Sequence, residues 1–270
     1  MPKPPPLKPF KASLLTITSR NARFQQWESL LTNRNKRHRA GEFLVQGVRP
    51  ITLAVGEGWP IHALIHLADH ALSRWALDIL NTVDTQHVTM SGDLLAELAE
   101  KDAELVAVVG QRPDDLSRIA NGLVMVFDRP TSPGNIGTLI RSADAFGATG
   151  VVVTGHAADI YDPKSVRAST GSLLTLPVVR FDGYPEEVVR HFKAQVIGLD
   201  ESGPAELAAV DLTPPTVLVV GNETHGMSAA WRDACDVVAH IPIGGGASSL
   251  NAAAAATVAL YEASRQRSAR

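Results

Sequence analysis

Cysteine is almost absent from this sequence, and so are long apolar runs; each absence excludes a class of protein. Cys235 is the single cysteine among 270 residues, which excludes a small fold held together by disulfides. The most uniform apolar run, Ala252 to Tyr261, is far shorter than the roughly 20 residues that cross a bilayer. The first residues, MPKPPPLKPFK, do not resemble a signal peptide. We therefore expect a cytoplasmic protein with no membrane partner.

The sequence does contain enough apolar material for a folded core. Hydrophobic residues make up 45% of the chain and charged residues 20%, close to the globular average. Disorder as the overall state is thereby excluded. A length of 270 residues fits one large domain or two small ones, at roughly 100–200 residues per domain.

Charge is distributed unevenly, with a basic arm over residues 1–40. The arm holds nine Lys or Arg against one acid, a net charge of +8, so the remaining 230 residues must carry −11 to give the total of −3. Such asymmetry indicates a polyanionic partner, and Phe24, Trp27 and neighbouring amides suit bases that are not paired in a duplex. The alternative is a solvated leader that only keeps the protein soluble.

The chain divides by pattern into four segments. We expect a disordered leader over residues 1–11, a small α/β domain over 12–110, a linker over 111–121 and a second domain over 122–270. Residues 12–40 are predicted to be helical, because apolar residues recur there at a spacing of three to four.

Strand-like runs alternate with helical stretches throughout the second domain, which predicts a parallel sheet covered by helices. One helix is predicted to start near Asn135, and the last to run from about Leu250 to Tyr261. The predicted strands are LVMVF (123–127), VVV (151–153), LPVV (176–179), QVIGL (195–199), VLVV (217–220) and VVAHI (237–241).

Several familiar chemistries are disfavoured. GNETHGMS (221–228) resembles a phosphate-binding P-loop, but Met227 stands where the lysine must be, so an ATPase or GTPase is not expected. No G-x-G-x-x-G motif follows a strand. Cys235 is predicted to be buried rather than nucleophilic. The histidines His62, His66 and His70 lie four residues apart and would share one face of a helix, as metal ligands could. Their apolar neighbours fit a strand equally well, which would separate them, so no metal site is predicted.

Three loops rich in Gly, Ser and Asn follow strands of the second domain, at 128–142, 220–228 and 241–251. Ligands of open α/β sheets bind at the carboxyl ends of strands, and glycines let main-chain groups approach a ligand closely. The pattern predicts a site for a ligand recognised through main-chain groups, such as an adenine ring.

These three loops resemble the three motifs of the SpoU/TrmH group of SPOUT RNA 2′-O-ribose methyltransferases. The motifs are NIGTLIRSADAFGA (135–148), GNE (221–223) and IPIGGGASSLN (241–251), and the resemblance covers roughly residues 123–262. The upstream ITSRNARFQQW through GEFLVQGVRP resembles the substrate-binding domain of this group. The whole-chain pattern, including DRPTSPGNIG and HAADIYDPKSVRASTGS, is most similar to the avilamycin-resistance type of 23S rRNA methyltransferase.

The resemblance implies an α/β fold in which a small RNA-binding α/β domain precedes a SPOUT parallel-sheet domain with a C-terminal trefoil knot. It also implies a homodimer with the active site built across the interface. The chain departs from the family's usual motifs at Thr224 and His225, which make the second loop bulkier, and at Ile243, which replaces a usual Met.

The resemblance further implies methyl transfer from S-adenosylmethionine to a ribose 2′-OH, in 23S rRNA, with an association with antibiotic resistance. It assigns catalysis to Arg141, Asn135, Glu223, Ser249 and Asn251, and cofactor binding to Gly221, Ile241 and Leu250. It places RNA binding on the arm, at Arg20, Arg23, Arg34, Lys36, Arg37 and Arg39, and implies no metal.

Arginine is an awkward base, because its guanidinium keeps its proton in proteins. Our hypothesis is that Arg141 grips the adjacent phosphate or stabilises the developing alkoxide. The alternatives kept open are a non-catalytic RNA-binding protein, a tRNA 2′-O-methyltransferase of the same family, and methylation of a base.

Overall fold

The computed structural model describes residues 14–68, 70–99 and 103–269. The chain forms two compact units, Met1–Gln111 and Arg112–Arg270, and each is described by itself. The predicted leader over residues 1–11 lies outside the described residues.

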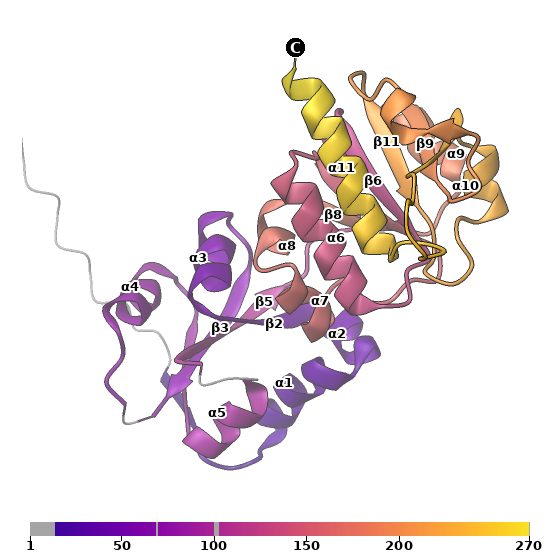
Figure 1. The fold of residues 1–270 in the computed structure, drawn as a ribbon. Coiled ribbons are helices and arrows are strands. Elements are labelled where there is room, and N and C mark those ends of the chain that lie inside the picture. Colours follow the sequence, from indigo (N-terminus) through magenta and orange to yellow (C-terminus); the bar gives the residue numbers. More distant parts are fainter. Residues whose placement is uncertain (1–13, 69, 100–102, 270) are drawn as a thin grey trace, which may run out of the picture. The chain divides into compact units, whose positions relative to one another are not determined.

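The first unit is an α/β sandwich around a five-stranded mixed sheet of order β1-β4-β3-β5-β2 (Figure 1). Strands β1 and β3 pair with β4 in parallel, whereas β5 pairs with β3 and β2 in the antiparallel sense. The strands are β1 Leu14–Ile17, β2 Glu42–Gln46, β3 Ile61–Leu67, β4 Gln86–Met90 and β5 Leu105–Gly110. The helices are α1 Ala22–Thr32, α2 Arg34–Ala40, α3 Val48–Gly56, α4 Arg74–Thr82 and α5 Gly92–Leu98.

The predicted helix over residues 12–40 is wrong at its start and is divided in two. Residues Leu14–Ile17 form an edge strand that pairs with β4, and Ile17 is buried in the core. Asn21 then caps α1 and Asn33 caps α2, each side chain accepting a backbone N–H. The cause is tertiary pairing at the first segment and capping asparagines at the two helix starts.

The second unit contains a seven-stranded sheet of order β10-β12-β9-β11-β6-β7-β8, in which every neighbouring pair is parallel. The prediction of a parallel sheet is therefore confirmed, and each predicted run overlaps a strand, although β8 starts two residues after the predicted run LPVV (176–179) begins. The strands are β6 Leu123–Asp128, β7 Gly150–Thr154, β8 Val178–Phe181, β9 Gln195–Leu199, β10 Ala205–Glu206, β11 Thr216–Val220 and β12 Val237–His240. The short edge strand β10 is an addition.

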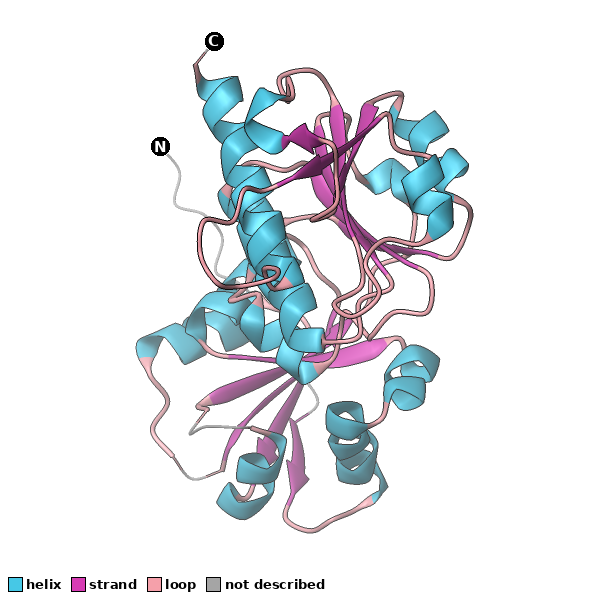
Figure 2. Cartoon of the chain, turned by 45° about the vertical axis from the view of Figure 1, so that its right-hand side comes forward, coloured by secondary structure: helices cyan, strands magenta, loops and turns pink. Residues whose placement is uncertain are grey.

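Helices cover both faces of this sheet (Figure 2). On one face, α6 and α11 lie side by side (Figure 1), and the Ser142 and Thr257 hydroxyls are 2.7 Å apart between them. On the other face, α9 and α10 contribute Phe192 and Trp231 to the core. The helices and 3₁₀ turns are α6 Pro133–Ala145, α7 Pro163–Ala168, α8 Ser172–Thr175, α9 Pro185–Phe192, α10 Ala229–Asp233, α11 Ala252–Ser268, η1 Leu116–Arg118 and η2 Leu207–Ala209.

Two predicted helix ends need correction. The cap of α6 is Ser132, whose hydroxyl accepts from the Asn135 N–H, so the helix starts earlier and the Asn135 side chain is available for other contacts. Helix α11 runs on to Ser268 instead of ending at Tyr261, because residues such as Gln266 and Arg267 bind carbonyls of the 210–214 segment. Among the described residues, no helix has the length and apolar character needed to cross a bilayer.

Candidate active site

The three predicted loops lie at one edge of the larger sheet, where parallel strands place their carboxyl ends together. Strands β6 and β11 are neighbours, so the loop after Asp128 lies beside the loop after Val220. A pocket of about 350 Å³ opens at this edge. It is lined by Leu199, Asp200, Glu201, Val220, Gly221, Asn222, Glu223, Thr224, His225, Gly226, Ala239, Ile241, Ile243, Ser249, Leu250, Ala252 and Ala255.

Gly221 starts the second loop at a point where the chain passes very close to itself. A Cβ atom added there would lie 2.1 Å from backbone atoms of Gly226 and Met227. Asn222 and Gly226 exchange two backbone hydrogen bonds of 3.0 Å and close the loop. Any side chain at 221 would force this closed loop apart, which explains the glycine by packing.

Asn222 organises the same loop, and sequence reasoning missed it. Its buried side chain accepts from the Thr224 and His225 N–H groups at 2.9 and 3.1 Å. It also donates to the Arg129 carbonyl at 2.7 Å, which ties the second loop to the first. The signal was present, since an Asn within a turn commonly binds backbone groups two residues on.

Glu223 is the centre of a hydrogen-bonded cluster. Its carboxylate accepts from the Thr131 N–H and hydroxyl, both at 3.0 Å, and from the Ser132 N–H at 3.2 Å. The Asn135 amide donates a fourth bond at 2.9 Å. Partial burial raises the pKa of Glu223, but the hydrogen bonds from Asn135 and Thr131 outweigh burial and hold the pKa below its usual value.

Asn251 joins the third motif to this cluster. Its amide donates to the Asn135 side-chain oxygen at 3.3 Å, while its own oxygen accepts from the Ala253 and Ala254 N–H groups and caps α11. Three predicted catalytic residues from three loops thus form one continuous network. Ser249 lines the adjoining pocket, as do the three predicted cofactor residues Gly221, Ile241 and Leu250.

Arg141 is not brought to this cluster within one chain. It lies on α6, its side chain is exposed, and it is absent from the lining of the pocket. No hydrogen bond or ion pair engages it among the described residues.

The predicted RNA contacts divide into two groups. Arg37 is only 2% exposed and donates to the Leu30 carbonyl at 2.7 Å, so it supports the first unit from within and does not face RNA in this conformation. Arg20 pairs with Glu28 and Glu97. Arg23, Lys36 and Arg39 are exposed and Arg34 is partly exposed, and the Arg23 guanidinium lies 5.7 Å from the Trp27 ring centre.

The structure defines the surroundings of two of the spaced histidines and of Cys235. His62 and His66 lie on a strand, β3, and the described residues contain no group of three or more His, Cys, Asp or Glu that could hold a metal ion. Burial raises the pKa of Cys235 to about 11, which makes its thiol a poor nucleophile.

Sequence comparison matches both parts of the chain to known families. Residues 122–261 match the SpoU rRNA Methylase family, and residues 21–109 match the SpoU L30e-like domain. The chain is 57% identical over 265 residues to the 23S rRNA (uridine(2479)-2'-O)-methyltransferase of Streptomyces viridochromogenes, covering 93% of this chain and 92% of that protein.

Solved structures of related methyltransferases match most of the chain. The SpoU methyltransferase AviRb from Streptomyces viridochromogenes in complex with the cofactor AdoMet superposes with a TM-score of 0.87 at 55% identity, over 92% of this chain and 98% of that one. The AdoMet-bound rRNA methyltransferase from Sinorhizobium meliloti gives a TM-score of 0.83 at 26% identity, over 93% and 98% of the two chains.

Proposed function

The chain belongs to the SpoU rRNA methylase family, and we propose that it transfers a methyl group from S-adenosylmethionine to a ribose 2′-OH of 23S rRNA. One observation carries the proposal: Glu223, Asn135 and Asn251 form a single hydrogen-bonded network at the rim of the pocket. Such a network is a preorganised polar wall, and preorganisation is what a one-step transfer between two bound reactants requires.

The pocket fits S-adenosylmethionine. Gly221 lines the pocket, and Leu199, Val220, Ile241 and Leu250 supply apolar walls for an adenine ring. Glu223 adds negative charge to the pocket lining, where it would attract a cationic cofactor, whereas the Asp200 carboxylate is already paired with Arg232. When bound, the cofactor supplies an activated methyl group; the chain supplies orientation and the exclusion of water.

The catalytic cluster would hold the acceptor ribose. Because the pKa of Glu223 is held low, its carboxylate is ionised at neutral pH and keeps Asn135 fixed. Asn251 then has its amide directed at Asn135, so the three side chains have few alternative arrangements. Holding reactants in line can contribute several kcal/mol to catalysis, about 7–11 kcal/mol at its largest.

We propose that Arg141 completes this site in a homodimer. Helix α11 presents an exposed apolar stripe beside α6, with Val258 at 40% and Tyr261 at 55% exposure, and exposed Leu250 precedes it. Contiguous exposed apolar surface marks an interaction site. An interface over α6 and α11 would bring Arg141 of one copy to the pocket of the other, where it grips the phosphate or stabilises the developing alkoxide.

RNA capture is assigned to the first unit, over residues 12–110. The exposed basic residues of α1 and α2, Arg23, Lys36 and Arg39, with partly exposed Arg34, would meet phosphates, and Arg37 is left out because it is buried. We also propose that the second unit contains a trefoil knot, that the protein is cytoplasmic and that methyl transfer needs no metal.

The test is transfer of labelled methyl from S-adenosylmethionine to 23S rRNA, with Arg141→Ala beside the wild type. The product is mapped by alkaline hydrolysis, because a 2′-O-methyl group blocks cleavage at the neighbouring phosphate. We expect alkali-resistant label with the wild type and a loss of at least about a hundredfold in the variant, the size that removal of one transition-state donor produces. Arg190→Ala, an exposed arginine on α9, is the matched control and should retain activity.

Other outcomes would redirect the proposal. Alkali-sensitive label would move the chemistry to a base, and label on tRNA alone would change the substrate. RNA binding without any methyl transfer would favour a non-catalytic RNA-binding protein.

A further inference from the structure

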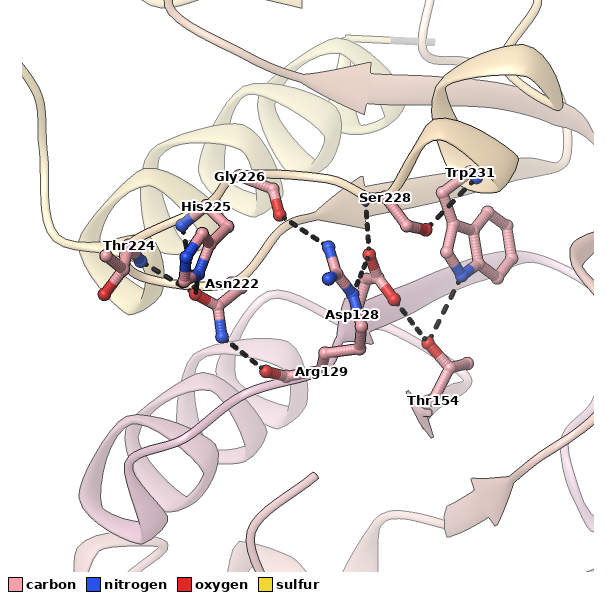
Figure 3. Close-up of polar contacts among 9 residues, drawn as sticks. All are labelled: Asp128, Arg129, Thr154, Asn222, Thr224, His225, Gly226, Ser228 and Trp231. Carbon is pink, nitrogen blue, oxygen red and sulfur yellow. Dashed lines mark hydrogen bonds and ion pairs between the residues drawn. The ribbon is translucent and has the colours of Figure 1, made fainter. Parts of the chain in front are cut away.

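Asp128, the last residue of β6, is a buried carboxylate that lies outside the three sequence motifs. It is 2% exposed, and it accepts from the Ser228 N–H at 2.7 Å and from the Thr154 hydroxyl at 3.2 Å (Figure 3). Thr154 is its register partner on β7, and the Trp231 indole N–H in turn donates to Thr154 at 3.2 Å. A carboxylate fixed in this way binds the end of the second loop to the centre of the sheet.

Arg129 extends from the same point to the rest of that loop. Its guanidinium binds Asp128 through Nε at 3.2 Å and donates from Nη2 to the Gly226 carbonyl at 3.2 Å. Its own carbonyl accepts the Asn222 amide at 2.7 Å (Figure 3). Asp128 and Arg129 therefore hold the loop at three positions, Asn222, Gly226 and Ser228, and residues 222–226 line the pocket.

The backbone of Arg129 is kept in an unusual conformation to make these bonds. Its φ is 53°, a left-handed value that non-glycine residues rarely adopt. Gly155 makes the arrangement possible, since a Cβ there would lie 2.7 Å from the Arg129 Cγ. A strained backbone conformation of this kind persists only where several surrounding contacts fix it. Here those contacts include the hydrogen bonds between Arg129 and loop 221–228.

We propose that Asp128 and Arg129 are positioning residues that set the conformation of loop 221–228 and thereby the affinity for S-adenosylmethionine. The inference rests on the proposed function of the pocket. It requires that loss of the pair weakens cofactor binding more than RNA binding, most of which is assigned to the first unit.

Asp128→Asn is the main test, with Arg129→Met and Arg129→Lys beside it. The amide can keep its oxygen toward the Ser228 N–H and Arg129 Nε only if its NH₂ faces the Thr154 hydroxyl, which must then turn to accept, and the charge on all of these bonds is lost. We expect at least about a tenfold rise in the dissociation constant and KM for S-adenosylmethionine, since a bond to a charged group is typically worth that much. The KM for RNA should rise less than the KM for S-adenosylmethionine, and kcat at saturating cofactor should fall less than the latter rises.

Asp159→Asn is the matched control. Asp159 is also buried, at 4% exposed, and accepts from the Tyr161 N–H at 3.0 Å, within the segment between β7 and α7. It should lower thermal stability and leave cofactor affinity within about twofold. Arg129→Lys keeps the charge but cannot bridge Asp128 and Gly226 together, so its affinity should fall between wild type and Arg129→Met.

The outcomes separate the possible failures. Wild-type affinity in folded Asp128→Asn or Arg129→Met would overturn the inference, and so would equal loss of affinity in Asp159→Asn. If Asp128→Asn does not fold, the two Arg129 variants decide, because that side chain is partly exposed. A wild type that does not bind S-adenosylmethionine at all would instead refute the proposed function of the pocket.

Discussion

Glu223 accepts four hydrogen bonds, and replacing it with glutamine would measure what the cluster contributes to methyl transfer. Two donors reach each carboxylate oxygen: the Ser132 N–H and the Asn135 amide on Oε1, and the Thr131 N–H and hydroxyl on Oε2. The glutamine amide will point its NH₂ toward Thr131, because the hydroxyl can turn to accept whereas the Asn135 amide would have to flip. One charge-assisted bond, from the Thr131 N–H, is then lost outright.

The magnitude follows from that count. A hydrogen bond to a charged group contributes about 1.5–3 kcal/mol, and partial exposure of Glu223 lets water repay some of the loss, so we take about 2 kcal/mol. This corresponds to a decrease of roughly thirtyfold in kcat/KM. Glu223→Ala removes all four bonds and should be more damaging than Glu223→Gln.

The assay is single-turnover methyl transfer to 23S rRNA at saturating S-adenosylmethionine. Glu187→Gln is the control, because Glu187 accepts the Tyr184 N–H at the start of α9 and does not line the pocket. If Glu223→Gln retains activity within about threefold of the wild type, the cluster does not act through these hydrogen bonds and the reasoning is refuted.

Four further predictions follow from the same geometry. Because the folded pKa of Glu223 is lowered, its contribution to stability is complete above its unfolded pKa of about 4.3 and is lost as pH falls through the lower folded pKa. The unfolding free energies of the wild type and Glu223→Gln should therefore converge only in that acid range. Asn251→Ala removes the cap of α11 and should lower stability by about 1 kcal/mol in denaturant melts, with weaker methyl transfer; Asn251→Asp, which keeps the cap, should restore stability alone. Gly221→Ala should abolish cofactor binding by calorimetry, because its Cβ would overlap the backbone of the loop. Tyr261→Glu should separate a homodimer into monomers in sedimentation and lose activity, whereas exposed Tyr184→Glu should do neither.

Much of the fold could be predicted from the sequence, because buried parallel strands are formed by continuous apolar runs. VLVV (217–220) and QVIGL (195–199) each correspond to a strand within one residue. The edge strand Leu14–Ile17 was mistaken for helix because its four residues are too few to show a period, and pairing with β4 decides its conformation. Local pattern therefore succeeds in the centre of a sheet and fails at its edge.

The site residues could be predicted from the sequence only where they belong to one of the three motifs. Asn135 and Glu223 could be named from the sequence, but their direct contact joins residues that are 88 positions apart. Asp128 and Arg129 give no signal of their own, since a charged pair after a strand usually marks a solvated turn. Arg37 looked like any other basic residue of the arm, and its burial depends on how α1 and α2 pack.

Asn251 both caps helix α11 and bonds to Asn135, so the start of the helix and the hydrogen-bonded cluster depend on the same side chain. It comes last in the chain, after Asn135 on α6 and Glu223 in the loop after β11. The cluster is therefore closed only when the start of α11 is in place, and recovery of methyl transfer during refolding should coincide with the docking of α11.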